Sequence, residues 1–448
     1  MSGLSHNRRG AGSFDRRAWL KLSAAGVLGC GMSGWLERLA AASLPGRRPG
    51  GCILLWMNGG PSQLDTFDLK PGTPNGGQFS DIDTTVPGIK ISEHLPKVAT
   101  HAADMCIIRS MTTKEGDHGR ATSLVHSGYL PQGPIRYPTL GSLVAKELGA
   151  SDAELPNFVS IAPFRALAPA AYGPGFLGST YAPLVVGDKR GTPAAEGDYA
   201  LTVENLTSAN SLSTESVDGR LHLLGAQNDR FTRGRPAATH HVVAYERAVR
   251  LMRSSAGRAF DLDDESAETR ERYGKTRFGQ SCLLSRRLVE RGVPFVEVTL
   301  SGVDDQTPGW DTHAKNFETV KKLSEVLDPA WAALMSDLKS SGLLDTTLVV
   351  WMGEFGRTPA INTQAGRDHF PNAWSAVVAG AKTVGGQVVG RTSADGMTIE
   401  DRPVAVPDLL ATVCKAIDID PEKQNISNTG RPISIVDSKA QPVAEILR

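Results

Sequence analysis

Four groups of polar residues along the 448-residue chain carry acidic side chains close to glycines, and three of the four contain histidine. They lie at residues 58–68, 117–120, 310–313 and 354–369. Carboxylate and imidazole groups are the ligands that zinc takes in proteins, whereas calcium or manganese favours carboxylates and carbonyls. We therefore expect a divalent metal site, with zinc, calcium or manganese as the ion.

Arginines accompany these groups at Arg120, Arg357 and Arg367. A guanidinium can hold an anion through two parallel hydrogen bonds. A metal with arginines suits the transfer of a phosphate or sulfate ester group, which needs charge neutralisation and an activated water or hydroxyl. Simpler interpretations remain for each motif alone: an isolated Asp-x-His pair is more often a turn, and residues 353–357 could form a tight turn with a surface ion pair.

Short apolar runs that look like buried strands must position these groups. They lie at residues 52–57, 105–108, 158–161, 295–300, 347–352 and 375–379. Helical segments are expected between them, at 140–148, 242–252, 280–290, 317–338 and 406–417. This alternation predicts an α/β fold, a three-layer α/β/α sandwich with a mostly parallel central sheet. The four polar groups each follow a strand, so they should meet at the carboxyl edge of that sheet.

The composition describes an ordinary globular protein with 48 basic and 48 acidic residues and a formal charge of zero. A neutral chain has no general attraction to nucleic acid or to an anionic membrane, so we expect neither as a partner. We expect one domain over residues 43–448, with a loop-rich insertion at about 162–240. The four cysteines of this domain are widely separated and read as buried small hydrophobes.

The N-terminal segment reads as a twin-arginine export signal over residues 1–42. Arg16 and Arg17 are followed by Leu20 and Lys21, then by a weakly apolar stretch and small residues at 39–42. We therefore expect a periplasmic or cell-surface protein. Two alternatives are an amphipathic helix of the mature fold and a lipoprotein, since Cys30 ends a sequence that loosely resembles a lipid-attachment site; only lipidation at Cys30 would place the protein on a membrane.

The motifs together resemble a secreted bacterial family, domain of unknown function 1501. The resemblance rests on residues 59–68, 310–317, 353–359 and 366–369, in that order, and covers nearly all of the mature chain. That family looks like a branch of the alkaline phosphatase and sulfatase superfamily. The resemblance implies an alkaline-phosphatase-like α/β/α sandwich with metals at the carboxyl edge of the sheet.

The superfamily pattern carries over only in part. Its first strand ends in an aspartate metal ligand, where this chain has Asn58; Asp65 or Asp68 could take its place. Its Asp-His ligand pair is matched by Asp311 and His313, and its final histidine by His369. Its Asp-His-Gly strand end reads Glu354-Phe355-Gly356 here, and the region around 117–123 contains no clear nucleophile.

Two functions follow as expectations. The first is a metal-dependent hydrolase of phosphate or sulfate esters, acting on an anionic small molecule or an extracellular polysaccharide. The second is a catalytically degenerate family member that binds a glycan or a partner at the cell surface. For the hydrolase, the expected metal ligands are Asp311, His313, Glu354 and His369, with Asn58 and Asp65 in the superfamily positions. Glu354 is also a candidate base, Arg357 would hold the anion, and His118 would protonate the leaving group.

Overall fold

The computed structural model describes residues 50–187, 201, 203–204, 206, 213–235, 238–302 and 309–448. The expected export signal, including Cys30, and much of the expected insertion lie outside these residues. Residues 49–448 form one compact unit. Within the described part of the chain, no helix is both long and apolar enough to cross a membrane.

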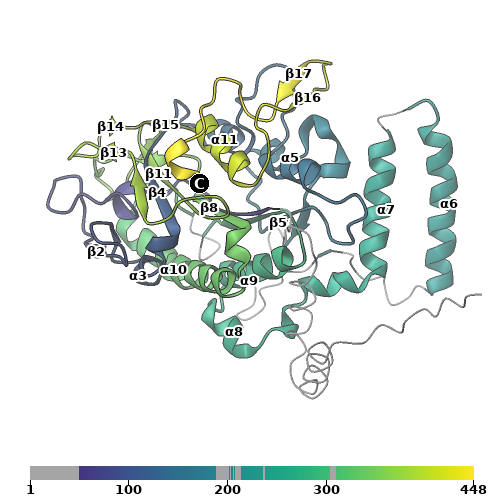
Figure 1. The fold of residues 1–448 in the computed structure, drawn as a ribbon, viewed down its shortest axis with the longest axis horizontal. Helices are drawn as coiled ribbons and strands as arrows, with labels where there is room; N and C mark the ends of the chain where they lie inside the picture. Colours follow the sequence, from purple (N-terminus) through teal and green to yellow (C-terminus); the bar gives the residue numbers. More distant parts are fainter. Residues whose placement is uncertain are drawn as a thin grey trace, which may run out of the picture. The chain divides into compact units, whose positions relative to one another are not determined.

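A nine-stranded sheet runs through this unit (Figure 1). In spatial order its strands are β12 (Gln387–Val389), β4 (Met105–Thr112), β11 (Trp374–Gly380), β8 (Thr347–Met352), β1 (Gly51–Met57), β7 (Phe295–Leu300), β5 (Phe158–Ile161) and β6 (Leu184–Val186), with β15 (Val404–Ala405) beside β4. Strand β11 alone among these runs antiparallel to its neighbours, β4 and β8. The α/β fold with a mostly parallel sheet is therefore confirmed.

Strand β1 explains why the apolar runs are continuous. Ile53, Leu55 and Met57 belong to the core on one face of the sheet. Cys52, Leu54 and Trp56 belong to the core on the other face. Because successive side chains point to opposite faces, a strand covered on both sides needs an apolar residue at every position.

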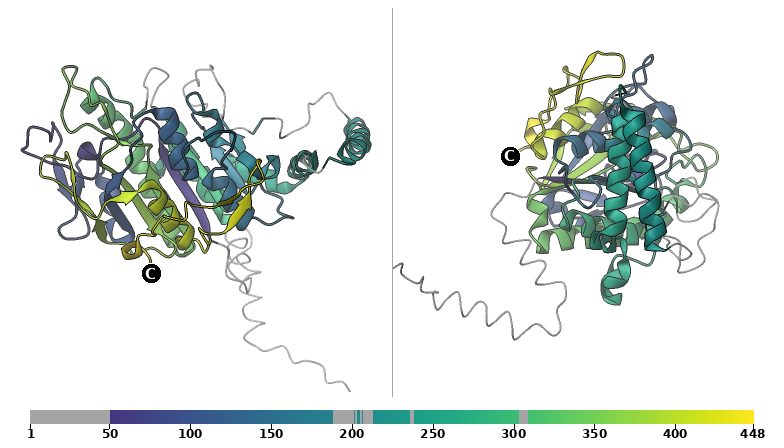
Figure 2. Two further views of the ribbon diagram at one scale, coloured as in Figure 1. Left: turned by 90° about the horizontal axis from the view of Figure 1, so that it is seen from above. Right: turned by 90° about the vertical axis from the view of Figure 1, so that its right-hand side faces the viewer.

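Helices cover both faces and make the three layers visible in Figures 1 and 2. On the first face lie α9 (Arg277–Glu290), α10 (Asn316–Ser340) and the short α3 (Pro96–Ala99), with α8 (Ala267–Arg272) in contact with α10. On the second face lie α4 (His118–Ser127), α5 (Leu140–Glu147) and α11 (Val406–Ala416).

In the described part of the chain, four two-stranded sheets lie outside the central one. They pair β2 (Asp81–Asp83) with β3 (Lys90–Ser92), β9 (Gly356–Arg357) with β10 (His369–Phe370), β13 (Arg391–Thr392) with β14 (Ile399–Asp401), and β16 (Gln424–Ile426) with β17 (Pro432–Ser434). The β9–β10 pair matters for the site because its register places His369 opposite Arg357.

The region expected to be rich in loops contains a long helix, α6 (Thr214–Thr232), which the sequence interpretation missed. It lies beside α7 (Thr239–Arg253) in both Figures 1 and 2. No residue from 215 to 232 is buried. Its apolar residues at helical spacing, Val217, Leu221 and Leu224, are few and only partly covered, so the periodic signal that reveals a helix in a sequence is weak here.

Candidate metal centre

Asp311 and His313 lie in a loop that follows β7 and packs against the end of β1. The Trp310 amide donates to the Asn58 carbonyl at 2.9 Å. Gly59 has a φ of +106°, and a Cβ there would lie 2.4 Å from the Asp311 amide nitrogen. Glycine is therefore required at position 59 both for its backbone conformation and for the close approach of this loop.

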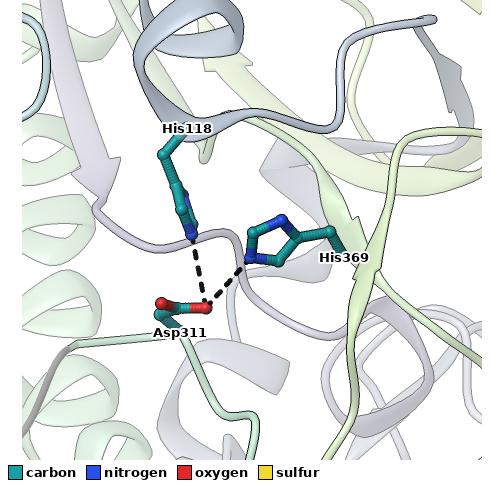
Figure 3. A group of neighbouring side chains, drawn as sticks. All are labelled: His118, Asp311 and His369. Atoms are coloured by element: carbon teal, nitrogen blue, oxygen red, sulfur yellow. Dashed lines mark hydrogen bonds and ion pairs between the residues drawn. The ribbon is translucent and has the colours of Figure 1, made fainter.

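Three imidazoles converge on the carboxylate of Asp311. Its Oδ1 lies 3.3 Å from Nε2 of His118, 3.1 Å from Nε2 of His313 and 3.3 Å from Nε2 of His369. The Nε2 atoms of His313 and His369 are 2.9 Å apart. Figure 3 shows His118 and His369 reaching Asp311 from different elements, α4 and β10. We call these four residues the histidine cluster.

The other ring nitrogen of each histidine is held by a hydrogen-bond acceptor. A carboxylate or carbonyl can only accept, so in each ring Nδ1 carries a proton, and Nε2 presents a lone pair to the cluster whenever the ring is neutral. Metal-binding histidines are commonly held in this way, with the ring nitrogen that does not bind the metal donating to an acceptor. The acceptors are Glu354 Oε1 for His118 (2.7 Å), the Gly116 carbonyl for His369 (2.7 Å) and Asp368 Oδ1 for His313 (2.8 Å).

Lone pairs facing one another need a positive charge between them. Nε2 of His118 is buried, and its contact with Asp311 Oδ1 is long, at 3.3 Å. Ligand atoms of His118, Asp311 and His369 all lie within 4.8 Å of one another, a spacing that could hold a metal ion. The donor set and its orientation therefore fit a divalent metal.

The charges of the cluster shift two pKa values. Burial alone would lower the pKa of His118, but hydrogen bonds and charge interactions with Asp311 and Glu354 outweigh it and raise this pKa to about 9. Burial works to raise the pKa of Asp311, but His118, His369 and Arg357 outweigh it and hold that pKa far below its ordinary value. Asp311 is thus ionised, and His118 attracts a cation or a proton.

Arg357 supports the cluster from beneath and is not free to hold an anion, which corrects the sequence expectation. Its side chain is fully buried. Its Nη2 lies 2.6 Å from Asp311 Oδ1 and also donates to the Gly59 carbonyl. Its Nε donates to the Gly60 carbonyl at 3.0 Å. With its donors directed at protein oxygens, the guanidinium fixes Asp311 and the end of β1.

Glu354 is placed as a support for His118 rather than as a ligand. It is 1% exposed, and besides the bond to His118 it accepts from the Gly59 amide at 3.0 Å. Both interactions direct the carboxylate at groups behind the cluster. Asn58 is tied through its backbone to Leu300 and Trp310, and among the described residues no hydrogen bond joins its side chain to the histidine cluster.

Asp65 lies in a separate buried ion pair, so the structure does not place it at the metal centre. Its carboxylate meets Arg367 through two contacts, Nε at 2.7 Å and Nη2 at 3.2 Å. Asn316 donates to it at 2.9 Å. The Arg367 amide in turn donates to the Thr312 carbonyl at 2.9 Å. Through the bond to Thr312, this network fixes the loop that carries Asp311 and His313. Asp68 is likewise engaged elsewhere, with Lys70 at 3.0 Å.

The sequence interpretation missed two partners of the cluster, Asp368 and the Gly116 carbonyl. Asp368 precedes His369 directly, so a carboxylate beside a candidate ligand was a usable signal. A backbone carbonyl carries no such signal in a sequence.

Within the described part of the chain, the cluster forms no hydrogen bond or ion pair with a serine or threonine hydroxyl or with a cysteine. The four cysteines are buried and free, and burial, the main cause, raises the pKa of Cys106 and of Cys414 to about 12. These thiols stay protonated and do not act as nucleophiles.

The chain is similar in structure to the PsFucS1 sulfatase from Pseudoalteromonas sp., with a TM-score of 0.38 and 12% identity over 86% of this chain and 70% of that one. It is also similar to the phosphonate monoester hydrolase of Agrobacterium radiobacter, with a TM-score of 0.36 and 13% identity over 89% and 77%. A third similar structure is a protein in the alkaline phosphatase superfamily from Vibrio parahaemolyticus, with a TM-score of 0.37 and 11% identity over 83% of this chain and 67% of that one.

A search of curated proteins found no match. The family profile described as "Protein of unknown function (DUF1501)" matches residues 50–447, which include every residue of the histidine cluster. The chain belongs to the DUF1501 family.

Proposed function

We propose that this protein is an exported, metal-dependent hydrolase of phosphate or sulfate esters. The observation that carries the proposal is the convergence of three Nε2 atoms on Asp311 Oδ1, with every Nδ1 turned outward to an acceptor. The ester class and the export route come from the sequence motifs, and an anionic small molecule or a polysaccharide remains the proposed substrate.

The spacing of the cluster supports a small ion with nitrogen ligands. Four ligands at about 2.0–2.1 Å from a tetrahedral ion lie about 3.3–3.4 Å from each other. The separations of 2.9, 3.1, 3.3 and 3.3 Å within the cluster are close to this edge length. Three imidazoles favour zinc over calcium, which takes oxygen ligands.

His118, Asp311 and His369 would hold the ion, because their ligand atoms all lie within 4.8 Å of one another, and His313 lies beside them on the solvent side. His313 is the exposed member, with 46% of its side chain accessible. Three inner ligands with an accessible side are typical of catalytic rather than structural zinc. The ligand position fits His118 better than the proton-donor role expected from the sequence, because its Nε2 faces Asp311 beside His369.

The ion would supply polarisation of the ester oxygen and an activated water. The chain's own residues define the rest of the chemistry. Since no hydroxyl or thiol bonds to the cluster in the described residues, we propose direct attack by water, without a covalent enzyme intermediate. Glu354 accepts the Nδ1 proton of His118, and Asp368 accepts that of His313, so each carboxylate orients one imidazole. Arg357 keeps Asp311 ionised and oriented.

A second function, binding without chemistry, is favoured by one observation. Arg357 and Arg367, two of the three motif arginines, are fully buried and bonded to protein groups. Neither guanidinium is free to serve as the anion clamp usual for phosphoryl and sulfuryl transfer. A metal site that only binds a glycan or a partner would keep the cluster and need no such clamp.

Metal analysis of the mature protein, followed by an ester panel, tests the proposal. The protein should be purified without a polyhistidine tag, stripped with chelator and reloaded with zinc, manganese or calcium. We expect about one equivalent of zinc and zinc-dependent release of phosphate or sulfate from aryl esters or sulfated polysaccharide. Metal uptake without turnover on any ester would support the binding protein; no stoichiometric metal would reject both the site and the hydrolase.

A further inference from the structure

A second group of buried polar side chains lies between α4 and the sheet, apart from the histidine cluster. Its six members are 0–4% exposed, and each has a polar atom without a hydrogen-bond partner. They are Trp56, His126, Ser160, Tyr172, Glu297 and Thr299. Buried polar atoms in folded proteins are mostly hydrogen-bonded to protein groups or to ordered water, so a group of this kind is a place to look for a bound water.

The sheet register brings four of them together on one face. Glu297 on β7 lies directly beside Ser160 on the neighbouring strand β5. Thr299 lies two residues after Glu297 on β7, so its side chain is on the same face of the sheet. Trp56 pairs with Thr299 across β1 and β7. Trp56 belongs to the core on the α4 side of the sheet. Glu297 is therefore a carboxylate in the middle of a central strand, pointing into a packed layer.

The rings of His126 and Tyr172 complete the group. The His126 ring centroid lies 4.3 Å from that of Trp56 and 4.9 Å from that of Tyr172. His126 Nε2 is 3.7 Å from Glu297 Oε1. That separation is too long for a direct hydrogen bond, which needs about 2.7–3.2 Å. A third group that bonds to each atom would join them.

The orientation of His126 identifies what this group must offer. Its Nδ1 donates to the Thr122 carbonyl at 2.9 Å, so Nε2 accepts in the neutral ring and donates in the protonated ring. Glu297 Oε1 accepts when the carboxyl is ionised, and the Trp56 indole N–H can only donate. A water molecule both donates and accepts, so it can pair with all three atoms, whereas a cation cannot accept from the indole.

We propose that Glu297 and His126 bind an ordered internal water, with Trp56 or Tyr172 as donor to it. Burial above all, then Glu297 and Glu354, raises the pKa of Tyr172 well above its ordinary value, so its hydroxyl stays a neutral donor. Buried waters commonly make about three hydrogen bonds to otherwise unsatisfied groups. The water ties β7 to α4, the helix that also carries His118.

A crystal structure of the mature protein with anomalous data at a zinc and a manganese edge tests this directly. We expect a density peak at about 2.6–3.2 Å from both Glu297 Oε1 and His126 Nε2, without anomalous signal. Direct contact between the two side chains with no peak would overturn the proposal. So would an anomalous peak, or ligand distances near 2.3–2.6 Å typical of calcium.

A solution experiment gives an independent readout. Oxygen-17 magnetic relaxation dispersion counts long-lived internal waters in the native protein. The double variant Glu297→Leu/His126→Phe should lose at least one such water, and the surface control Glu422→Leu/His222→Phe should lose none. Equal counts in the double variant and the native protein would refute the proposal. If the double variant does not fold, the crystal structure of the native chain still decides.

Discussion

His313 and His369 face each other through Nε2 atoms 2.9 Å apart, although each holds its Nδ1 proton in a separate hydrogen bond. Two neutral imidazoles in this orientation repel each other through their lone pairs. A proton or a metal ion between them removes the repulsion, which makes this pair the sharpest indicator of what the site binds.

The first prediction concerns His369, the imidazole that contacts both His313 and Asp311. His369→Ala should abolish stoichiometric zinc binding, because it removes a ligand and leaves the remaining lone pairs without a complete set. Metal content of the purified, untagged variant by mass spectrometry measures this. His222→Ala, a change at an exposed position on α6, should keep the zinc. Full zinc occupancy in His369→Ala would remove His369 from the site.

The second prediction concerns pH. The pKa of His118 is raised from 6.5 to about 9 in the folded protein without metal. A raised pKa means that protonated His118 stabilises the fold fully below pH 6.5 and that this contribution is lost as the pH rises through about 9. Over the same window zinc affinity should increase, since the proton must leave before the ion binds.

Unfolding of chelator-treated protein between pH 6 and 9, with and without buffered zinc, checks this pair of opposite trends. The His118→Asn variant serves as the control because it cannot titrate in this range. A zinc affinity that is independent of pH across the window would contradict the prediction.

The third prediction assigns Glu354 a positioning role. Glu354→Gln should lower zinc affinity by about 10–100-fold, the usual cost of losing the carboxylate behind a ligating histidine. The fold should persist, because the amide oxygen can still accept from the Gly59 amide. Competition with a zinc indicator measures the affinity, with Glu422→Gln as a matched exposed control. An affinity equal to that of Glu422→Gln would leave Glu354 without this role.

The fourth prediction concerns the buried pair of Asp65 and Arg367. Asp65→Asn should lower the free energy of unfolding by about 3–5 kcal/mol, because it leaves a buried guanidinium without its counter-charge. The double variant Asp65→Leu/Arg367→Met removes both charges and should lose less than the single variant. Denaturant unfolding of the metal-free proteins compares them. A single variant as stable as the native protein would show that the pair is not structurally important.

The fifth prediction concerns export. Replacing Arg16 and Arg17 by lysine should leave unprocessed precursor in the cytoplasm, because the translocase recognises the arginine pair. Fractionation followed by immunoblotting distinguishes precursor from mature protein. Normal export of this variant would exclude the twin-arginine route. A lipid on Cys30 of the exported native protein would instead show that the protein is anchored to a membrane.

The strands were the most predictable part of the molecule. The runs at 158–161, 295–300 and 347–352 coincide with β5, β7 and β8. A strand buried on both faces must be apolar throughout, so its limits are visible in the sequence. The antiparallel direction of β11 was not visible, since strand direction depends on the path of the connection.

The site was predictable in membership and less so in roles. Strand order brought Asp311, His313 and His369 together, as the polar ends of the strands suggested. The same reasoning could not separate Glu354, which lies behind His118, from a ligand, because both roles use a carboxylate at a strand end. Asp65 and Arg357 were misassigned for a related reason: their burial arises from packing between distant segments, which composition and spacing do not encode.

The histidine cluster is built from segments that are far apart in the sequence, so folding must come before metal binding. Its members come from the start of α4, the loop after β7 and strand β10, and only Asp311 and His313 are close in sequence. The unfolded chain therefore offers an ion no complete set of ligands, and the set exists only once the central sheet and the β9–β10 pair have formed. An ion that binds only the native fold should leave the refolding rate unchanged and slow unfolding. Metal binding would then stabilise the native state after folding is complete and would not help to start folding.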